Sequence, residues 1–208
     1  MADLLKIKEK VKERYGKVAL TGDSCCGPSA SFESGGGCCS GNNNTVLQSS
    51  QSAAQVSELV GYDNKDLKSI PEASILGAGC GTPTKFAFIK EGDTVVDLGS
   101  GAGIDVFLAA NLVKGSGRAI GIDMTDEMLE KARKNAADNG YTNAECRKAN
   151  IEERISVDDN SVDVVISNCV INLTTDKVKT FREIYRILKP NGIGSQGQLY
   201  YLYQERRI

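Results

Sequence analysis

The chain has 208 residues, of which 40% are hydrophobic and 25% are charged, and its formal net charge is −2. These values are ordinary for a soluble globular protein with one sizeable core, and they give no electrostatic basis for binding nucleic acid or an anionic membrane. The sequence contains no histidine, which excludes Ser-His triads, Cys-His pairs and His-ligated metal sites.

The first sixteen residues are charged throughout and lack the apolar stretch of a secretory signal. No apolar run approaches the roughly 20 residues that are needed to span a bilayer. We therefore expect a cytoplasmic protein with no membrane partner. Because the seven cysteines are an odd number, we also expect free thiols rather than a disulfide framework.

The N-terminal third shows little regular patterning after its first segment. Apolar positions recur between charges over residues 2–15, which predicts an amphipathic helix, whereas the Gly-, Ser- and Asn-rich stretch 22–44 predicts loop. A second helix is expected near 52–60. We interpret residues 1–70 as an N-terminal helical and Cys/Gly/Ser-rich extension, and residues 71–208 as a second domain.

From Ile89 onward, short apolar strands alternate with helices. Strands are expected at 94–98, 119–123, 144–149 and 162–167, and helices over 104–113, from Thr125 to Gly140 and over 176–188. The last helix carries an apolar face made of Val178, Phe181, Ile184, Tyr185 and Leu188. Repeated strand–helix alternation predicts an α/β, Rossmann-like fold with a mostly parallel sheet and helices on both faces.

A glycine-rich turn follows the first of these strands. Asp97 begins the pattern D-x-G-x-G-x-G at a strand-to-helix junction, where glycine lets the backbone approach a ligand closely. Ile104 occupies the place of the third glycine of the dinucleotide fingerprint, so there is no sign of a pyrophosphate cradle. Asp123 closes the next strand about 20 residues later, where a carboxylate can accept hydrogen bonds from ribose hydroxyls.

The glycine turn together with this acid resembles class I S-adenosylmethionine-dependent methyltransferases, and the resemblance extends from Thr94 to Gly192. It implies that S-adenosylmethionine is the cofactor, with the glycine turn along its methionine moiety, Asp123 on the ribose and Asn168 facing the reacting centre. The cofactor-binding residues implied by the resemblance are Asp97, Gly99, Ser100, Gly101, Asp123, Met124, Asn150, Ile151 and Asn168.

Four segments sharpen the resemblance to arsenite methyltransferases: LGAGCGTP, VVDLGSGAGIDVFLAA, GIDMTDEML and SNCVINL, which fall within residues 54–192. The implied reaction is transfer of a methyl group to arsenite or methylarsenite, an arsenic detoxification. Trivalent arsenic is a soft centre that thiolates bind readily, and its lone pair makes it a nucleophile that needs no general base. Cys80 and Cys169 are the predicted catalytic arsenic ligands, with glutathione or thioredoxin as the expected reductant.

The remaining cysteines leave alternatives open. Adjacent cysteines cannot easily direct both sulfurs at one ion, which disfavours a zinc site at Cys25-Cys26 and Cys38-Cys39. These four thiols would bind arsenic and pass it inward, form a reducible pair during turnover, or lie in a disordered segment without a function. Cys146 lies within an expected strand and is interpreted as core packing.

The resemblance ends after Gly192, where relatives continue with a fifth strand, a helix and a hairpin that carries a further cysteine. We therefore expect a methyltransferase domain that is incomplete at its C-terminus, with the sheet truncated after the fourth or fifth strand and one strand near 199–203. An exposed sheet edge predicts a homodimer. Two alternative functions are a methyltransferase for a small organic acceptor and a non-catalytic thiol protein that binds arsenic or another soft metal.

Overall fold

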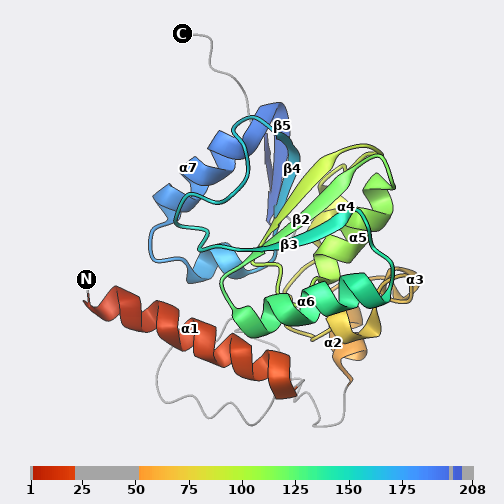
Figure 1. Ribbon diagram of the computed structural model, residues 1–208, viewed down its shortest axis with the longest axis horizontal. Helices are drawn as coiled ribbons and strands as arrows, with labels where there is room; N and C mark the ends of the chain where they lie inside the picture. The colour runs from red at the N-terminus through yellow and green to blue at the C-terminus, as the bar shows by residue number, and fades with distance from the viewer. Residues whose placement is uncertain (1, 22–51, 197–198, 203–208) are drawn as a thin grey trace.

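The computed structural model describes residues 2–21, 52–196 and 199–202, which form an α/β structure around one sheet (Figure 1). Cys25, Cys26, Cys38 and Cys39 lie outside the described residues, so the alternatives for them stay predictions. In chain order the elements are α1 (Ala2–Thr21), α2 (Ala53–Leu59), α3 (Asn64–Leu67), the 3-10 turn η1 (Glu72–Ser74), α4 (Pro83–Phe86), β1 (Thr94–Leu98), α5 (Ile104–Val113), β2 (Arg118–Asp123), α6 (Asp126–Asp138), β3 (Ala144–Lys148), β4 (Val162–Ser167), the 3-10 turn η2 (Val170–Leu173), α7 (Lys177–Ile187), β5 (Leu188–Gln196) and β6 (Leu199–Leu202).

The sheet contains six described strands in the order β3-β2-β1-β4-β5-β6. β1 to β5 run parallel, and β6 pairs antiparallel with β5. The chain adds β2 and β3 on one side of β1 and then returns to the other side of β1 with β4. The carboxyl ends of β1 and β4 therefore flank the point where strand order reverses, which is where open α/β sheets bind ligands.

The predicted mostly parallel, Rossmann-like sheet is confirmed, and its parallel part ends with the fifth strand. The strand expected near 199–203 is β6, whereas β5, from Leu188 to Gln196, is a strand that was not predicted. The register between β4 and β5 shifts between Val162 and Val164, and Asn191 adopts a φ of 67°. A strand irregularity of this kind accommodates Pro and Asn without ending the strand.

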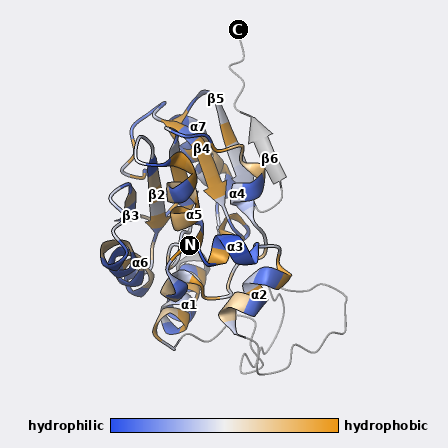
Figure 2. Ribbon diagram, turned by 90° about the vertical axis from the view of Figure 1, so that its right-hand side faces the viewer, coloured by the Kyte–Doolittle hydropathy of each residue, from blue (hydrophilic) through white to orange (hydrophobic). Residues whose placement is uncertain are grey.

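Helices cover both faces of the sheet because neighbouring strand residues point to opposite sides. Val95 packs with Val106 and Ala109 of α5, whereas Val96 packs on the opposite face with Ile184 of α7. α6 lies on the same face as α5, beside β3. Figure 2 shows the hydrophobic residues concentrated along the strands and the inward sides of the helices.

The apolar face predicted for α7 is only partly correct. Ile184 and Leu188 are 2% and 1% exposed, as expected, but Val178, Phe181 and Tyr185 are 60%, 42% and 55% exposed. Ile187, at 0%, takes their place against the sheet. The buried side of α7 is therefore rotated from the predicted one. The sheet covers only part of the helix surface on which the large apolar side chains lie.

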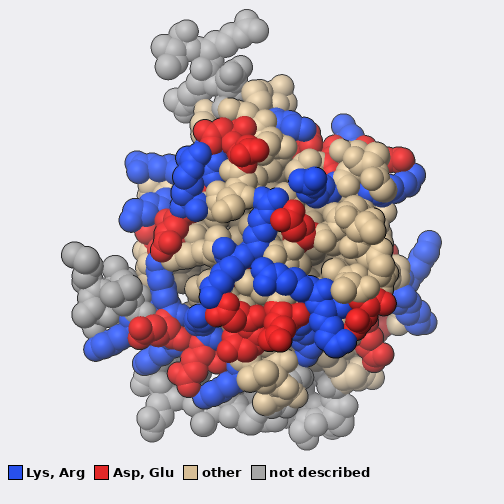
Figure 3. All heavy atoms as spheres, in the orientation of Figure 1, with Lys and Arg blue, Asp and Glu red and all other residues tan. Residues whose placement is uncertain are grey.

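α1 continues to Thr21, beyond the predicted end at residue 15, and crosses the carboxyl side of the sheet next to α6 (Figure 1). Val18 and Ala19 are buried with Met128, which explains the extension. Lys12 forms an ion pair with Asp126 at 3.4 Å, on a face where acidic and basic side chains are interspersed (Figure 3). Exposed pairs contribute about 0–1 kcal/mol, so apolar burial holds α1 more strongly than charge does.

None of the helices in the described part of the chain combines the length and the apolar character that crossing a membrane requires.

Candidate functional site

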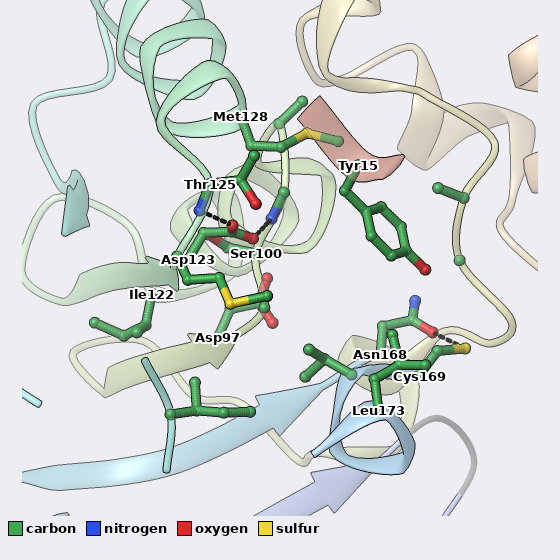
Figure 4. A pocket seen from close by; sticks show the side chains of 18 of the residues that line it. Tyr15, Asp97, Ser100, Ile122, Asp123, Thr125, Met128, Asn168, Cys169 and Leu173 are labelled. Atoms are coloured by element: carbon green, nitrogen blue, oxygen red, sulfur yellow. Dashed lines mark hydrogen bonds between the residues drawn. The ribbon is translucent and has the colours of Figure 1, made fainter. Parts of the chain in front are cut away.

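A cavity opens at the carboxyl ends of β1, β2 and β4, between the sheet and α1 (Figure 4). Residues from both predicted domains line it, including Tyr15 and Ser57 from the N-terminal segment, so the boundary at residue 70 does not separate the walls of this cavity. All the predicted cofactor-binding residues line this one cavity: Asp97, Gly99, Ser100, Gly101, Asp123, Met124, Asn150, Ile151 and Asn168.

The glycine turn requires glycine for two separate reasons. Gly99 has a φ of 76° and Gly101 a φ of 54°, which is the left-handed region that side chains disfavour. A Cβ on Gly99 would also lie 2.6 Å from the Cβ of Val170. Gly99 therefore lets the end of β1 lie close to Val170, the residue that follows Cys169. The predicted cofactor-binding residues and Cys169 thus line the same cavity.

Asp123 holds the far side of the turn in place. Its Oδ2 accepts a hydrogen bond from the backbone N of Gly101 at 2.9 Å, and its Oδ1 accepts one from the backbone N of Thr125 at 2.8 Å (Figure 4). Burial raises the pKa of Asp123, and these backbone donors oppose the increase. The carboxylate thus shapes the glycine turn and still presents lone pairs to the cavity.

Two further carboxylates are almost fully buried in the same cavity: Asp97 is 3% exposed and Asp105 is 1% exposed. Asp97 Oδ1, Asp105 Oδ1 and Ser100 Oγ have no hydrogen-bond partner in the described part of the chain. Burial raises the pKa of Asp97 well above its ordinary value, and the charges of Asp105 and Asp123 raise it further. Buried polar oxygens without partners are costly, so this cavity is suited to a ligand that donates hydrogen bonds.

Asn168 connects these carboxylates to the cysteine loop. Its Nδ2 lies 3.0 Å from Tyr62 Oη, 2.8 Å from the carbonyl oxygen of Gly81 and 3.2 Å from Asp105 Oδ2. Its Oδ1 accepts a hydrogen bond from the backbone N of Cys80 at 3.1 Å. An amide has two hydrogens and one carbonyl oxygen, so these contacts fix which way the side chain points.

Cys80 and Cys169 are joined by a disulfide, with their Cα atoms 6.1 Å apart. Cys169 lines the cavity, and Cys80 is exposed next to it. The expectation of free thiols is therefore wrong for this pair, because the loop before α4 reaches the end of β4, a contact that the 89-residue separation conceals. Cys169 has a φ of 64°, an unusual conformation for a residue with a side chain and one that clusters at functional sites.

Cys146 behaves as predicted. It is buried with Leu129 and Ala132, and burial raises the pKa of its thiol to about 11. It stays protonated at neutral pH and serves as a small core residue.

The sequence analysis did not identify several residues that line the cavity or contact its lining. Asp105 and Tyr62 share a hydrogen bond of 2.9 Å beside Asn168, and Lys8 of α1 pairs with Glu152 at 2.9 Å over the cavity. Asp105 could have been identified from the sequence, since it is the single charged residue in the largely apolar segment IDVFLAANLV. No local sequence pattern points to Tyr62 or Lys8, because only the folded chain brings them to the carboxyl ends of the strands.

Residues 89–196 match a family described as "Methyltransferase domain". The chain belongs to this family. The match covers β1 to β5 and therefore includes the glycine turn, the carboxylates and the loop that carries Asn168 and Cys169.

The predicted resemblance to arsenite methyltransferases is confirmed. The chain is 47% identical over 185 residues to an arsenite methyltransferase of Halobacterium salinarum, covering 89% of this chain and 45% of the relative. It is 41% identical over 146 residues to one of Aquipseudomonas alcaligenes, covering 66% of this chain and 40% of the relative. The chain thus spans less than half the length of these two relatives.

A solved structure is similar as well. The crystal structure of an arsenic(III) S-adenosylmethionine methyltransferase from Chlamydomonas reinhardtii matches with a TM-score of 0.53 and 35% identity. The match covers 68% of this chain and 47% of that one.

Proposed function

We propose that the chain transfers a methyl group from S-adenosylmethionine to trivalent arsenic held by the thiolates of Cys80 and Cys169. One observation carries the proposal: the two sulfurs meet at the end of β4, next to the cavity that the glycine turn forms. The relatives named above support arsenite or methylarsenite as the substrate, since both curated proteins are arsenite methyltransferases.

The residues of the cavity fit S-adenosylmethionine. This ligand is a cation with an ammonium group, ribose hydroxyls and an apolar adenine. Asp97 Oδ1 and Ser100 Oγ are buried acceptors without partners, which an ammonium group would satisfy. Asp123 lies beside Met124 and Ile151 at the other end, which suits a ribose next to an aromatic base. When bound, S-adenosylmethionine supplies an activated methyl carbon that accepts a lone pair while its sulfonium sulfur leaves as a neutral thioether.

The residues of this chain bind and orient rather than transfer protons. In the proposed site, the thiols of Cys80 and Cys169 form two As–S bonds and displace two hydroxyl groups of arsenite as water, which holds the arsenic and its lone pair beside the cavity. Asn168 holds the Cys80 loop through the backbone N of Cys80. Orientation of this kind can contribute up to roughly 7–11 kcal/mol to a reaction between two bound partners. Tyr15 and Val11 of α1 cover the cavity and limit the access of water.

The disulfide must be reduced before the pair can bind arsenic. Two thiols of a reductant such as glutathione or thioredoxin would supply two electrons and two protons, freeing both cysteines and forming the reductant's own disulfide. A cytoplasmic location, where thiols are kept reduced, suits this requirement. Among the described residues no third acidic or thiol side chain joins the pair in a metal-binding group. We propose that a third thiolate comes from glutathione or from one of the N-terminal cysteines.

Calorimetry on the whole chain tests the proposal. The reduced protein is expected to bind S-adenosylmethionine, and arsenite is expected to tighten that binding, since ligands that share a pocket affect each other reciprocally. The protein with its disulfide intact is expected to bind S-adenosylmethionine but to bind arsenite more weakly, through the N-terminal cysteines alone. The reduced Cys146→Ser variant is the matched control, because it removes a thiol outside the cavity. Equal arsenite binding by the reduced and oxidised proteins would reject Cys80 and Cys169 as ligands.

We also propose that the chain forms a homodimer through an edge of its sheet. β6 pairs with β5 on one side, and its other side has no partner strand within the described residues. An unpaired edge is a template for a strand from a second chain. Light scattering across a hundredfold range of concentration, roughly 1–100 μM, is expected to show the dimer; a monomer at every concentration would contradict it.

A further inference from the structure

The charges that line the cavity are mostly negative. Asp97, Asp105, Asp123 and Glu152 line it together with one cationic side chain, that of Lys8. Lys8 forms its ion pair with Glu152 at 2.9 Å, which leaves the three aspartates. None of the ion pairs between described residues includes any of these three. A cationic ligand would supply the missing positive charge.

The three aspartates differ in how their charge is already stabilised. Asp123 accepts two backbone hydrogen bonds at the glycine turn. Asp105 accepts hydrogen bonds from Tyr62 Oη and Asn168 Nδ2, while its other oxygen has no partner. Asp97 has a buried oxygen without a partner as well, and its side chain lies near Ser100 and Asp123 (Figure 4).

Asp105 is the carboxylate on the cysteine side of the cavity. It is bonded to Asn168, whose Oδ1 lies 3.1 Å from the backbone N of Cys80 and 3.5 Å from Cys169 Sγ. Two side-chain contacts therefore separate Asp105 from the sulfur pair. In the proposed reaction, the sulfonium centre must come close to arsenic on these sulfurs, so its positive charge lies in the same part of the cavity.

We infer that the Asp105 carboxylate makes this cavity select the sulfonium cofactor over its neutral thioether product. The inference rests on the proposed function. A desolvated carboxylate attracts the sulfonium of S-adenosylmethionine and gains nothing from the uncharged sulfur of S-adenosylhomocysteine. Once the methyl group has left, the same carboxylate no longer holds the product, which favours its release.

Asp105 is also the member of the buried pair that carries charge at neutral pH. Burial raises the pKa of Asp105 to about 6, and the donors Asn168 and Tyr62 limit this increase. The pKa of Asp97 is raised well above its ordinary value. The charge of Asp105 raises the pKa of Asp97, so the carboxylate with the hydrogen-bond donors ionises first.

The test compares the affinities of S-adenosylmethionine, S-adenosylhomocysteine and sinefungin, an analogue with an ammonium group in place of the sulfonium. Calorimetry on the reduced full chain gives each ligand's Kd for the wild type and for Asp105→Asn. The variant is expected to bind both cations at least tenfold more weakly and S-adenosylhomocysteine within threefold of wild type. Tyr62→Phe removes one of the two donors that oppose the rise in the Asp105 pKa, so it is expected to weaken the cations in the same direction as Asp105→Asn but by less. Asp158→Asn makes the same charge change at an exposed position outside the cavity and is expected to change nothing.

Thermal unfolding separates this role from a structural one. Because burial disfavours the ionised carboxylate, ligand-free Asp105→Asn is expected to melt no lower than wild type at pH 7.5. Should the variant not fold, Asp105→Ser takes its place with the same expected ratio. Equal weakening of cationic and neutral ligands would overturn the inference, and so would an unchanged preference. A wild-type chain that binds none of the three ligands contradicts the proposed function instead.

Discussion

Cys80→Ser and Cys169→Ser are each expected to lower the rate of methylarsenic formation by at least about 10²-fold, the cost of losing correct placement of a reacting atom. Serine keeps the size of the side chain but replaces a soft thiolate with a hard hydroxyl that trivalent arsenic does not retain. Both variants are expected to bind S-adenosylmethionine with nearly wild-type affinity, because the residues of the glycine turn and Asp123 are unchanged. Mass spectrometry of methylated arsenic products, under excess thiol, measures the rate.

Cys146→Ser is the control for this pair of substitutions. Its thiol is buried with Leu129 and Ala132, away from the cavity, so its loss is expected to lower stability slightly and to leave turnover unchanged. If Cys80→Ser or Cys169→Ser turned over arsenite at the wild-type rate, arsenic would not be held by that sulfur. Methylation of an organic acceptor by the wild type, with no methylated arsenic, would instead favour a small-molecule methyltransferase.

Local sequence patterns predicted most of the fold. The strands at Thr94–Leu98 and Val162–Ser167 have the bounds that their apolar runs indicated, and Gly140 ends its helix region with a φ of 70°. The sequence patterns did not predict β5. Pro190 and Asn191 are turn formers, yet pairing with β4 keeps them in β5. Strand pairing depends on residues distant in sequence, and a local pattern does not contain that information.

The residues of the candidate site also fall into a predictable and an unpredictable group. Asp97, Gly99 and Asp123 were predicted because each has a fixed position at the end of a strand, and parallel strands bring those ends together. Tyr62 and Tyr15 belong to helical or loop segments whose positions depend on packing across the chain. The contact of Tyr62 with Asp105 and the place of Tyr15 at the cavity were therefore not predictable. Cys80 and Cys169 were expected to converge as ligands of one arsenic atom, whereas the disulfide between them was not expected.

Gly99→Ala is expected to weaken S-adenosylmethionine binding at least tenfold and to destabilise the chain. A side chain at a φ of 76° costs roughly 1–2 kcal/mol. The added methyl group would lie 2.6 Å from Val170 Cβ, and overpacking of this kind typically costs about 1–3 kcal/mol more. Relief requires the glycine turn or the Val170 segment to move, and both line the cavity. Urea unfolding measures the stability, and calorimetry measures the affinity.

Gly140→Ala is the control for Gly99→Ala, because it introduces the same backbone strain without a steric clash. Gly140 has a similar φ of 70°, but no atom lies within 4 Å of the position of its added Cβ. It is expected to lose only the roughly 1–2 kcal/mol of backbone strain and to bind S-adenosylmethionine like the wild type. In Gly99→Ala/Val170→Gly, the new methyl group no longer meets the Cβ and methyl groups of residue 170, so the overpacking share of the loss is expected to be recovered and affinity to rise again. If the double variant bound no better than Gly99→Ala, backbone strain alone would explain the loss, and close approach between β1 and the Cys169 turn would not be what forms the cavity.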